Sequence, residues 1–80
     1  ADLSDAMRET LREGTSQIVD RLARLIAAGI DDGSIPPLAA RDTAQTLYQL
    51  WLGASLLGKL NRNAEALENA MQFTRQLLSR

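Results

Sequence analysis

The sequence contains no cysteine and no histidine, and its aromatic residues are one Trp, one Tyr and one Phe. Without cysteine the chain has no disulfide, no thiolate metal site and no thiol redox chemistry. Without histidine it lacks the commonest general base of enzymes. These absences argue against the main classes of catalytic and metal-binding domain.

Two residue pairs could still suggest chemistry. Ser55 and Lys59 lie four residues apart, the spacing of a Ser–Lys dyad on one helical face. A small hydroxyl at a helix contact, with a lysine near the negative end of the helix dipole, explains this pair better. Asp31 and Asp32 precede a glycine, as acidic residues in turns commonly do. We therefore expect no enzyme activity, no metal site and no cofactor.

The chain has no excess of one charge and no membrane-length apolar segment. Nine basic residues oppose ten acidic ones, and the basic residues are spread along the sequence. Nucleic-acid modules cluster their cations to displace counterions from phosphates, so this chain by itself should not bind DNA. The longest mainly apolar run, residues 50–57, is much shorter than the roughly 20 residues that span a bilayer. We expect a cytoplasmic protein without a membrane partner.

Three helices are predicted, over about residues 4–32, 40–60 and 63–79, in one all-α domain. Ser4 and Asn63 are suitable N-caps for the first and third helices. Gly33 can end the first helix with a positive φ, after which Ile35 folds back and the two prolines prevent continuation. The internal Gly14 could kink or split this long helix.

The second and third helices carry more apolar surface than one small domain can cover. Between residues 44 and 60 the apolar side chains go nearly all the way round the helix, which is typical of burial on two sides. The third helix has two adjacent apolar stripes where a terminal helix of a monomer needs one. This surplus predicts a homodimer, since 80 residues make a marginal core.

Three ordered motifs resemble the C-terminal domain of TetR-family repressors. Residues 29–35 read GIDDGSI, similar to the family's helix-ending G-x-x-D-G-x-I. Residues 51–54 read WLGA, similar to the W-x-G-A/L of its penultimate helix, and residues 63–67 read NAEAL, similar to its S/D-P-E-A-L. The likeness covers nearly the whole chain, although residues 39–40 are Ala-Ala where the family often has Asp-Pro.

The resemblance implies a three-helix fragment of the effector-binding and dimerisation domain of a transcriptional repressor. In that family the last two helices pair with their copies as a four-helix bundle. A small apolar or amphipathic effector binds within the domain and relieves operator binding by an N-terminal helix-turn-helix. That helix-turn-helix is expected to be missing from this chain, which lacks an initiator Met.

Site residues follow from this interpretation. Candidates for the effector pocket are Trp51, Tyr48 and Ser55, because aromatic residues supply apolar area together with a polar handle. Ordinary core packing remains the competing interpretation for both aromatics. The dimer-interface candidates are Leu52, Gly53, Leu56, Lys59, Leu60, Leu67, Met71, Thr74 and Leu78.

A second hypothesis stays open at this stage. A small helical homodimer that acts as an interaction or scaffold module, unrelated to transcription, would show the same apolar surplus. The presence of a helix-turn-helix in the parent reading frame would distinguish the two.

Overall fold

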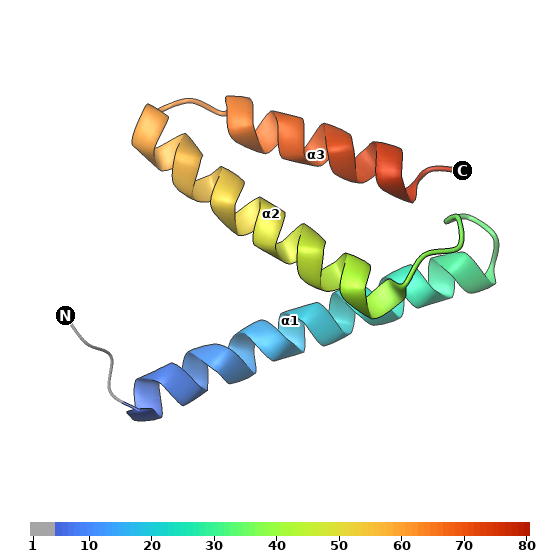
Figure 1. Ribbon diagram of the computed structural model, residues 1–80, viewed down its shortest axis with the longest axis horizontal. Helices are drawn as coiled ribbons and strands as arrows, with labels where there is room; N and C mark the ends of the chain where they lie inside the picture. The colour runs from blue at the N-terminus through green and yellow to red at the C-terminus, as the bar shows by residue number, and fades with distance from the viewer. Residues whose placement is uncertain (1–4) are drawn as a thin grey trace.

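The computed structural model describes residues 5–80 and consists of three helices, α1 (Asp5–Asp31), α2 (Ala40–Asn61) and α3 (Glu65–Leu78). Within these residues there is no strand, so the predicted all-α class is confirmed. α2 and α3 form an antiparallel hairpin, and α1 crosses α2 near the start of that helix (Figure 1). The predicted N-cap Ser4 lies outside the described residues.

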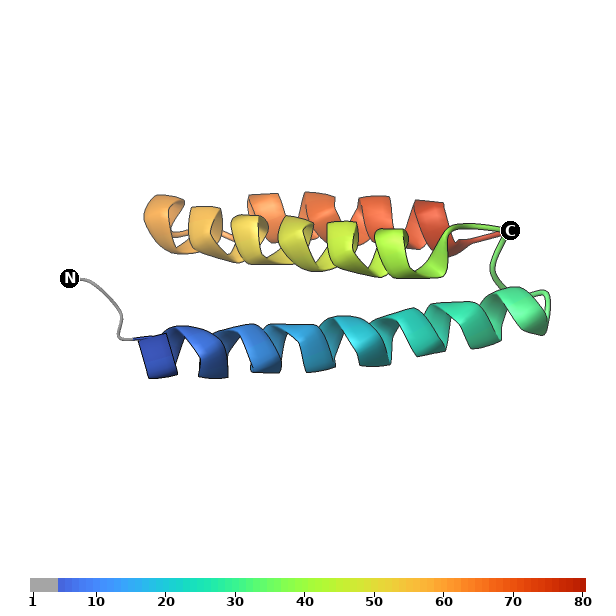
Figure 2. The same ribbon diagram turned by 60° about the horizontal axis from the view of Figure 1, so that its bottom comes forward.

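The molecule is a thin slab of two layers. α2 and α3 lie side by side in one layer, and α1 lies on one side of it (Figure 2). The principal extents are 46 × 31 × 12 Å and the Cα radius of gyration is 14.8 Å, against about 12 Å for a compact chain of this length. The exposed surface is 6063 Å², whereas a globular monomer of this mass exposes roughly 4,800 Å². The chain on its own therefore leaves much of its surface uncovered.

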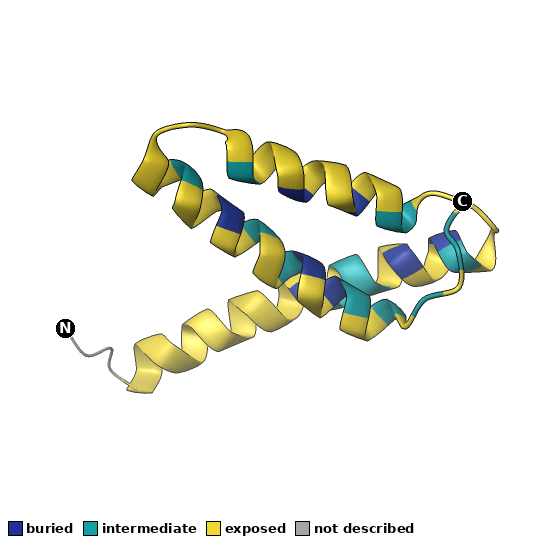
Figure 3. Ribbon diagram, turned by 45° about the horizontal axis from the view of Figure 1, so that its top comes forward, coloured by how far each residue is buried: buried dark blue, intermediate teal, exposed yellow. Residues whose placement is uncertain are grey.

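The core lies where α1 and α2 cross. Val19 and Ile26 of α1 pack with Ala44 and Leu47 of α2, and Leu47 is fully buried. The small Ala44 side chain allows the two helices to approach closely at the crossing. Figure 3 shows the buried positions on the facing sides of the helices, while the first half of α1 is exposed throughout. Apolar burial drives this packing, but it occupies only part of each helix.

α1 ends as the sequence predicted. Gly33 adopts a φ of +86°, and the backbone N–H of Ile35 donates to the carbonyl of Gly29 at 3.0 Å. A Cβ on Gly29 would lie 2.4 Å from Cδ1 of Ile35, so glycine is required for this return of the chain. α1 continues unbroken through Gly14, so the long helix is not split there.

Asp32 takes part in the turn after α1. Its Oδ1 accepts a hydrogen bond from the backbone N–H of Ser34 at 2.9 Å, and the Ser34 hydroxyl lies 2.6 Å from the same oxygen. The hydroxyl first, and then the backbone N–H, lower the pKa of Asp32 by stabilising the carboxylate. Within residues 5–80 no three metal-ligating side chains cluster together.

The start of α3 differs from the prediction. Ala64, not Asn63, occupies the N-cap position and makes no side-chain cap. Asn63 acts one residue earlier, where its Oδ1 accepts a hydrogen bond from the backbone N–H of Glu65 at 3.1 Å. An Asx turn therefore leads into the helix, a local alternative that the same residue type offers to the backbone.

Candidate functional site

Trp51 joins the three helices on the side of α2 that faces α1. Its indole Nε1 donates a hydrogen bond to Oγ1 of Thr74 on α3 at 2.9 Å, and the Thr74 hydroxyl donates to the carbonyl of Ala70 at 2.8 Å. Thr74 is the buried polar residue of the described chain, at 6% exposure. Both polar groups are thus satisfied inside the protomer, as buried polar groups must be.

The ring of Trp51 also lines a groove against α1. This Trp51 groove has a volume of about 490 Å³, and its lining is Gly14, Gln17, Ile18, Arg21, Leu22, Leu25 and Trp51. Small-molecule sites commonly fall between about 300 and 1,000 Å³ and combine apolar walls with few polar groups. The groove has the size and composition of such a site.

The other two effector candidates lie elsewhere. Tyr48 is half-buried against the core and lines a separate groove on the first half of α1, together with Arg12, Arg41 and Leu52. Ser55 is exposed and lines neither of these grooves. The structure therefore places Trp51, Tyr48 and Ser55 in three different surroundings and does not assemble them into one pocket.

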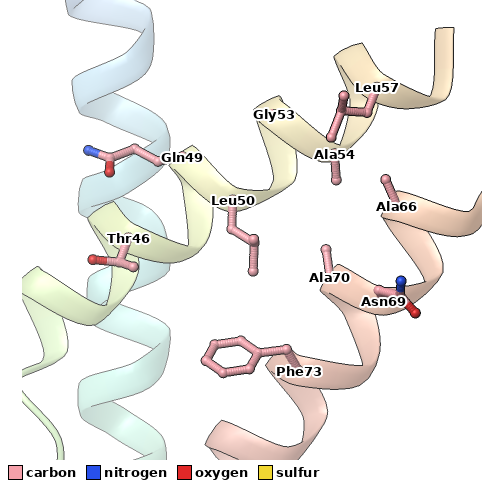
Figure 4. A pocket seen from close by; sticks show the side chains of 10 residues that line it. All are labelled: Thr46, Gln49, Leu50, Gly53, Ala54, Leu57, Ala66, Asn69, Ala70 and Phe73. Atoms are coloured by element: carbon pink, nitrogen blue, oxygen red, sulfur yellow. The ribbon is translucent and has the colours of Figure 1, made fainter. Parts of the chain in front are cut away.

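A third groove runs between α2 and α3 on the side turned away from α1 (Figure 4). This outer groove has a volume of about 680 Å³ and is lined by Thr46, Gln49, Leu50, Gly53, Ala54, Leu57, Ala66, Asn69, Ala70 and Phe73. Phe73 is 50% exposed and Leu57 47%. Exposed apolar side chains gathered along one groove are typical of surfaces that contact another molecule.

The predicted dimer residues divide among several surfaces. Gly53 lines the outer groove, and Leu56 and Leu60 are exposed three and seven residues further along the same face of α2. Leu52 faces the groove of Tyr48, and Lys59 is exposed. Leu67 and Met71 are exposed on the other side of α3 from Phe73. Thr74 is buried in the protomer, so it is not available to a partner, and Leu78 is half-buried.

The dimer-interface candidates from the sequence do not include Leu50, Leu57, Ala66 and Phe73, which line the outer groove. A signal for them was present, since Ala66, Ala70 and Phe73 form one of the two stripes of α3. The assignment chose the stripe of Leu67 and Met71 instead. Periodicity shows that two stripes exist, but the neighbour of each depends on the tertiary arrangement.

The family model of the tetracyclin repressor-like C-terminal domain matches residues 1–74. The chain belongs to this family. The predicted resemblance to TetR-type C-terminal domains is thereby confirmed, on a match that covers all of α1 and α2 and most of α3.

Individual proteins similar to this chain are also TetR-type regulators. The HTH-type transcriptional repressor NemR of Escherichia coli K12 is 33% identical over 82 residues, which cover 98% of this chain and 40% of NemR. A crystal structure of a TetR/AcrR-family transcriptional regulator superposes with a TM-score of 0.93 at 37% identity, over 98% of this chain and 43% of the regulator. The crystal structure of reduced E. coli NemR also gives a TM-score of 0.93, over 98% of this chain and 42% of that one.

The chain thus spans about two fifths of the relatives it matches. Of these relatives, NemR is named as a transcriptional repressor and the other as a transcriptional regulator. Within residues 5–80, no helix combines the length and the apolar character needed to cross a membrane.

Proposed function

We propose that this chain is the effector-binding and dimerisation part of a TetR-type transcriptional repressor. The observation that carries the proposal is the pair of mainly apolar grooves on opposite sides of α2. Trp51 and Gly53 are two residues apart, so they point about 200° apart around the helix, one into the Trp51 groove and the other into the outer groove. The scaffold hypothesis explains one such surface and not the second.

The outer groove is the proposed dimer interface, and its occupant is a second copy of the chain. The slab shape, the excess exposed surface and the exposed Leu50, Leu57 and Phe73 all favour a self-complementary contact. Two α2–α3 hairpins related by a two-fold axis form a four-helix bundle, in which Gly53 allows close approach. Gln49 and Asn69 at the edge supply hydrogen-bonding groups that fix the register.

The Trp51 groove is the proposed effector site. An effector bound there contacts α1 and α2 together, and Trp51 connects the site to α3 through Thr74. Binding would then shift the dimer between conformations that hold the DNA readers of the full-length protein at different separations. Operator DNA is bound by the helix-turn-helix domain of that full-length protein.

Paired charge substitutions test the dimer interface. Phe73→Glu places a carboxylate in the outer groove, and Met71→Glu places one on the other side of α3, where the sequence had predicted the interface. We expect the unmutated chain to be a dimer at micromolar concentration in light scattering, Phe73→Glu to be a folded monomer and Met71→Glu to remain dimeric. Circular dichroism confirms that each variant is helical.

Three results would contradict this assignment. A monomeric unmutated chain would remove the dimer altogether. Dissociation by Met71→Glu alone would place the seam on the other stripe of α3. An unchanged dimer in Phe73→Glu would exclude the outer groove.

The effector site is tested in the full-length protein. Trp51→Ala should weaken the response to effector and leave operator binding in its absence largely intact, measured as effector-dependent release of labelled operator. Equal loss of operator binding and of response would instead assign Trp51 to the core.

A further inference from the structure

We infer that the Trp51 groove selects a small amphipathic anion, with an apolar body and one carboxylate-type head that Arg21 binds. This inference rests on the proposed effector site and names the chemical class of its ligand. It follows from which polar side chains of the groove already form hydrogen bonds or ion pairs within the protein and which do not.

Trp51 offers the ligand only its apolar ring. Its N–H is directed to Thr74 at 2.9 Å, and the Thr74 hydroxyl is directed to the carbonyl of Ala70. A ligand that competed for the indole N–H would leave Thr74, which is 6% exposed, with an unsatisfied acceptor. Recognition of a ligand head group therefore falls to the α1 side of the groove.

That side presents one cation and one amide. Gln17 and Arg21 lie four residues apart on α1, so their side chains are neighbours on one helical face. Neither side chain makes a hydrogen bond or an ion pair within residues 5–80. No carboxylate lines the groove, and the nearby Asp20 is paired with Arg41. A guanidinium without a counterion favours an anionic head, which it can bind in a bidentate manner.

The remaining lining suits an apolar body. Ile18, Leu22 and Leu25 follow the same stretch of α1, and Leu25 is 64% exposed. Gly14 leaves open space at one end, since an added Cβ there would meet nothing within 4 Å. The row of apolar side chains runs beside the row formed by Gln17 and Arg21. A ligand that has an apolar body and one polar head can therefore contact both rows in only one orientation.

Three matched probes test the inference by isothermal titration calorimetry on the full-length protein. These probes are 4-phenylbutyrate, 4-phenylbutanol and 4-phenylbutylammonium, which share one apolar body and differ in the charge of the head. We expect the acid to bind about fivefold more tightly than the alcohol, and the ammonium ion to bind most weakly. Arg21→Gln should remove the difference between acid and alcohol without changing the affinity for the alcohol.

Arg24→Gln is the matched control, because Arg24 is also exposed on α1 and does not line the groove. It should retain the preference for the acid. Equal affinities for acid and alcohol, or equal effects of the two arginine substitutions, would overturn the anion preference and leave the effector site standing. Absence of binding by all three probes would overturn the effector site itself.

Discussion

The two halves of α1 carry similar apolar side chains in different surroundings. In residues 5–18 every side chain is exposed, including Leu11 at 59% and Ile18 at 48%. In the second half Val19 and Ile26 are buried at 5% and 2%, because the start of α2 crosses them. The apolar pattern continues through both halves, so burial here depends on what the rest of the chain places alongside.

The largest difference between the halves should appear when apolar volume is removed. Ile26→Ala empties a buried position and should lower the free energy of unfolding by about 2–5 kcal/mol. Leu11→Ala removes an exposed side chain and should change it by less than about 0.5 kcal/mol. Urea unfolding of the 80-residue chain, followed by circular dichroism, measures both. Equal losses of unfolding free energy would mean that the first half of α1 is also buried in solution, so that the two halves do not differ.

Two glycines of the same helix extend the test to the backbone. In Gly29→Ala the new Cβ would lie 2.4 Å from Cδ1 and 2.7 Å from Cγ1 of Ile35, which must then move. We expect a loss of about 1–3 kcal/mol, as for other overpacked sites. In Gly14→Ala the Cβ meets nothing, so the higher helix propensity of alanine should stabilise the chain by up to about 1 kcal/mol. The two substitutions should therefore shift the midpoint of thermal unfolding in opposite directions. A shift in the same direction would be inconsistent with the close contact between Gly29 and Ile35.

The smallest effect concerns the ion pairs. Asp20 of the second half pairs with Arg41 of α2, whereas Glu9 of the first half pairs with Arg12 of its own helix at 3.1 Å. All four side chains are largely exposed, so neither pair should contribute more than about 1 kcal/mol. Asp20→Asn should cost more than Glu9→Gln, because it weakens a contact between helices, and the difference should shrink in 1 M salt. A larger effect of Glu9→Gln in salt-dependent unfolding would argue against this ranking.

Local features of the fold could be predicted from the sequence. The three helices, the glycine at the end of α1 and the return of Ile35 depend on residues close together in the chain. Two local details were not predicted. Arg62 adopts a left-handed conformation at the end of α2, with a φ of 54°, where glycine is the usual residue. The Asx turn of Asn63 replaced the expected cap.

The candidate site was harder to predict, for a physical reason. Periodicity gives the angle of a residue around its helix but not the neighbour found at that angle. Thr74 and Met71 share one stripe in the sequence, yet Thr74 is buried beside Trp51 while Met71 is 38% exposed. The hydrogen bond from Trp51 joins residues that are 23 positions apart, a distance over which no sequence spacing gives a signal.

The crossing of α1 and α2 also makes α2 a mechanical lever. The buried contact at Ala44 and Leu47 is the point about which α2 can tilt relative to α1, the fulcrum of the lever. Beyond this contact α2 continues to Asn61 without crossing α1 again (Figure 1). Leu60 lies about 20 Å beyond Leu47 at the usual rise per residue. A tilt of about 5° at the fulcrum would therefore displace Leu60 by roughly 1.7 Å, as large as the helix shifts that switch subunit interfaces.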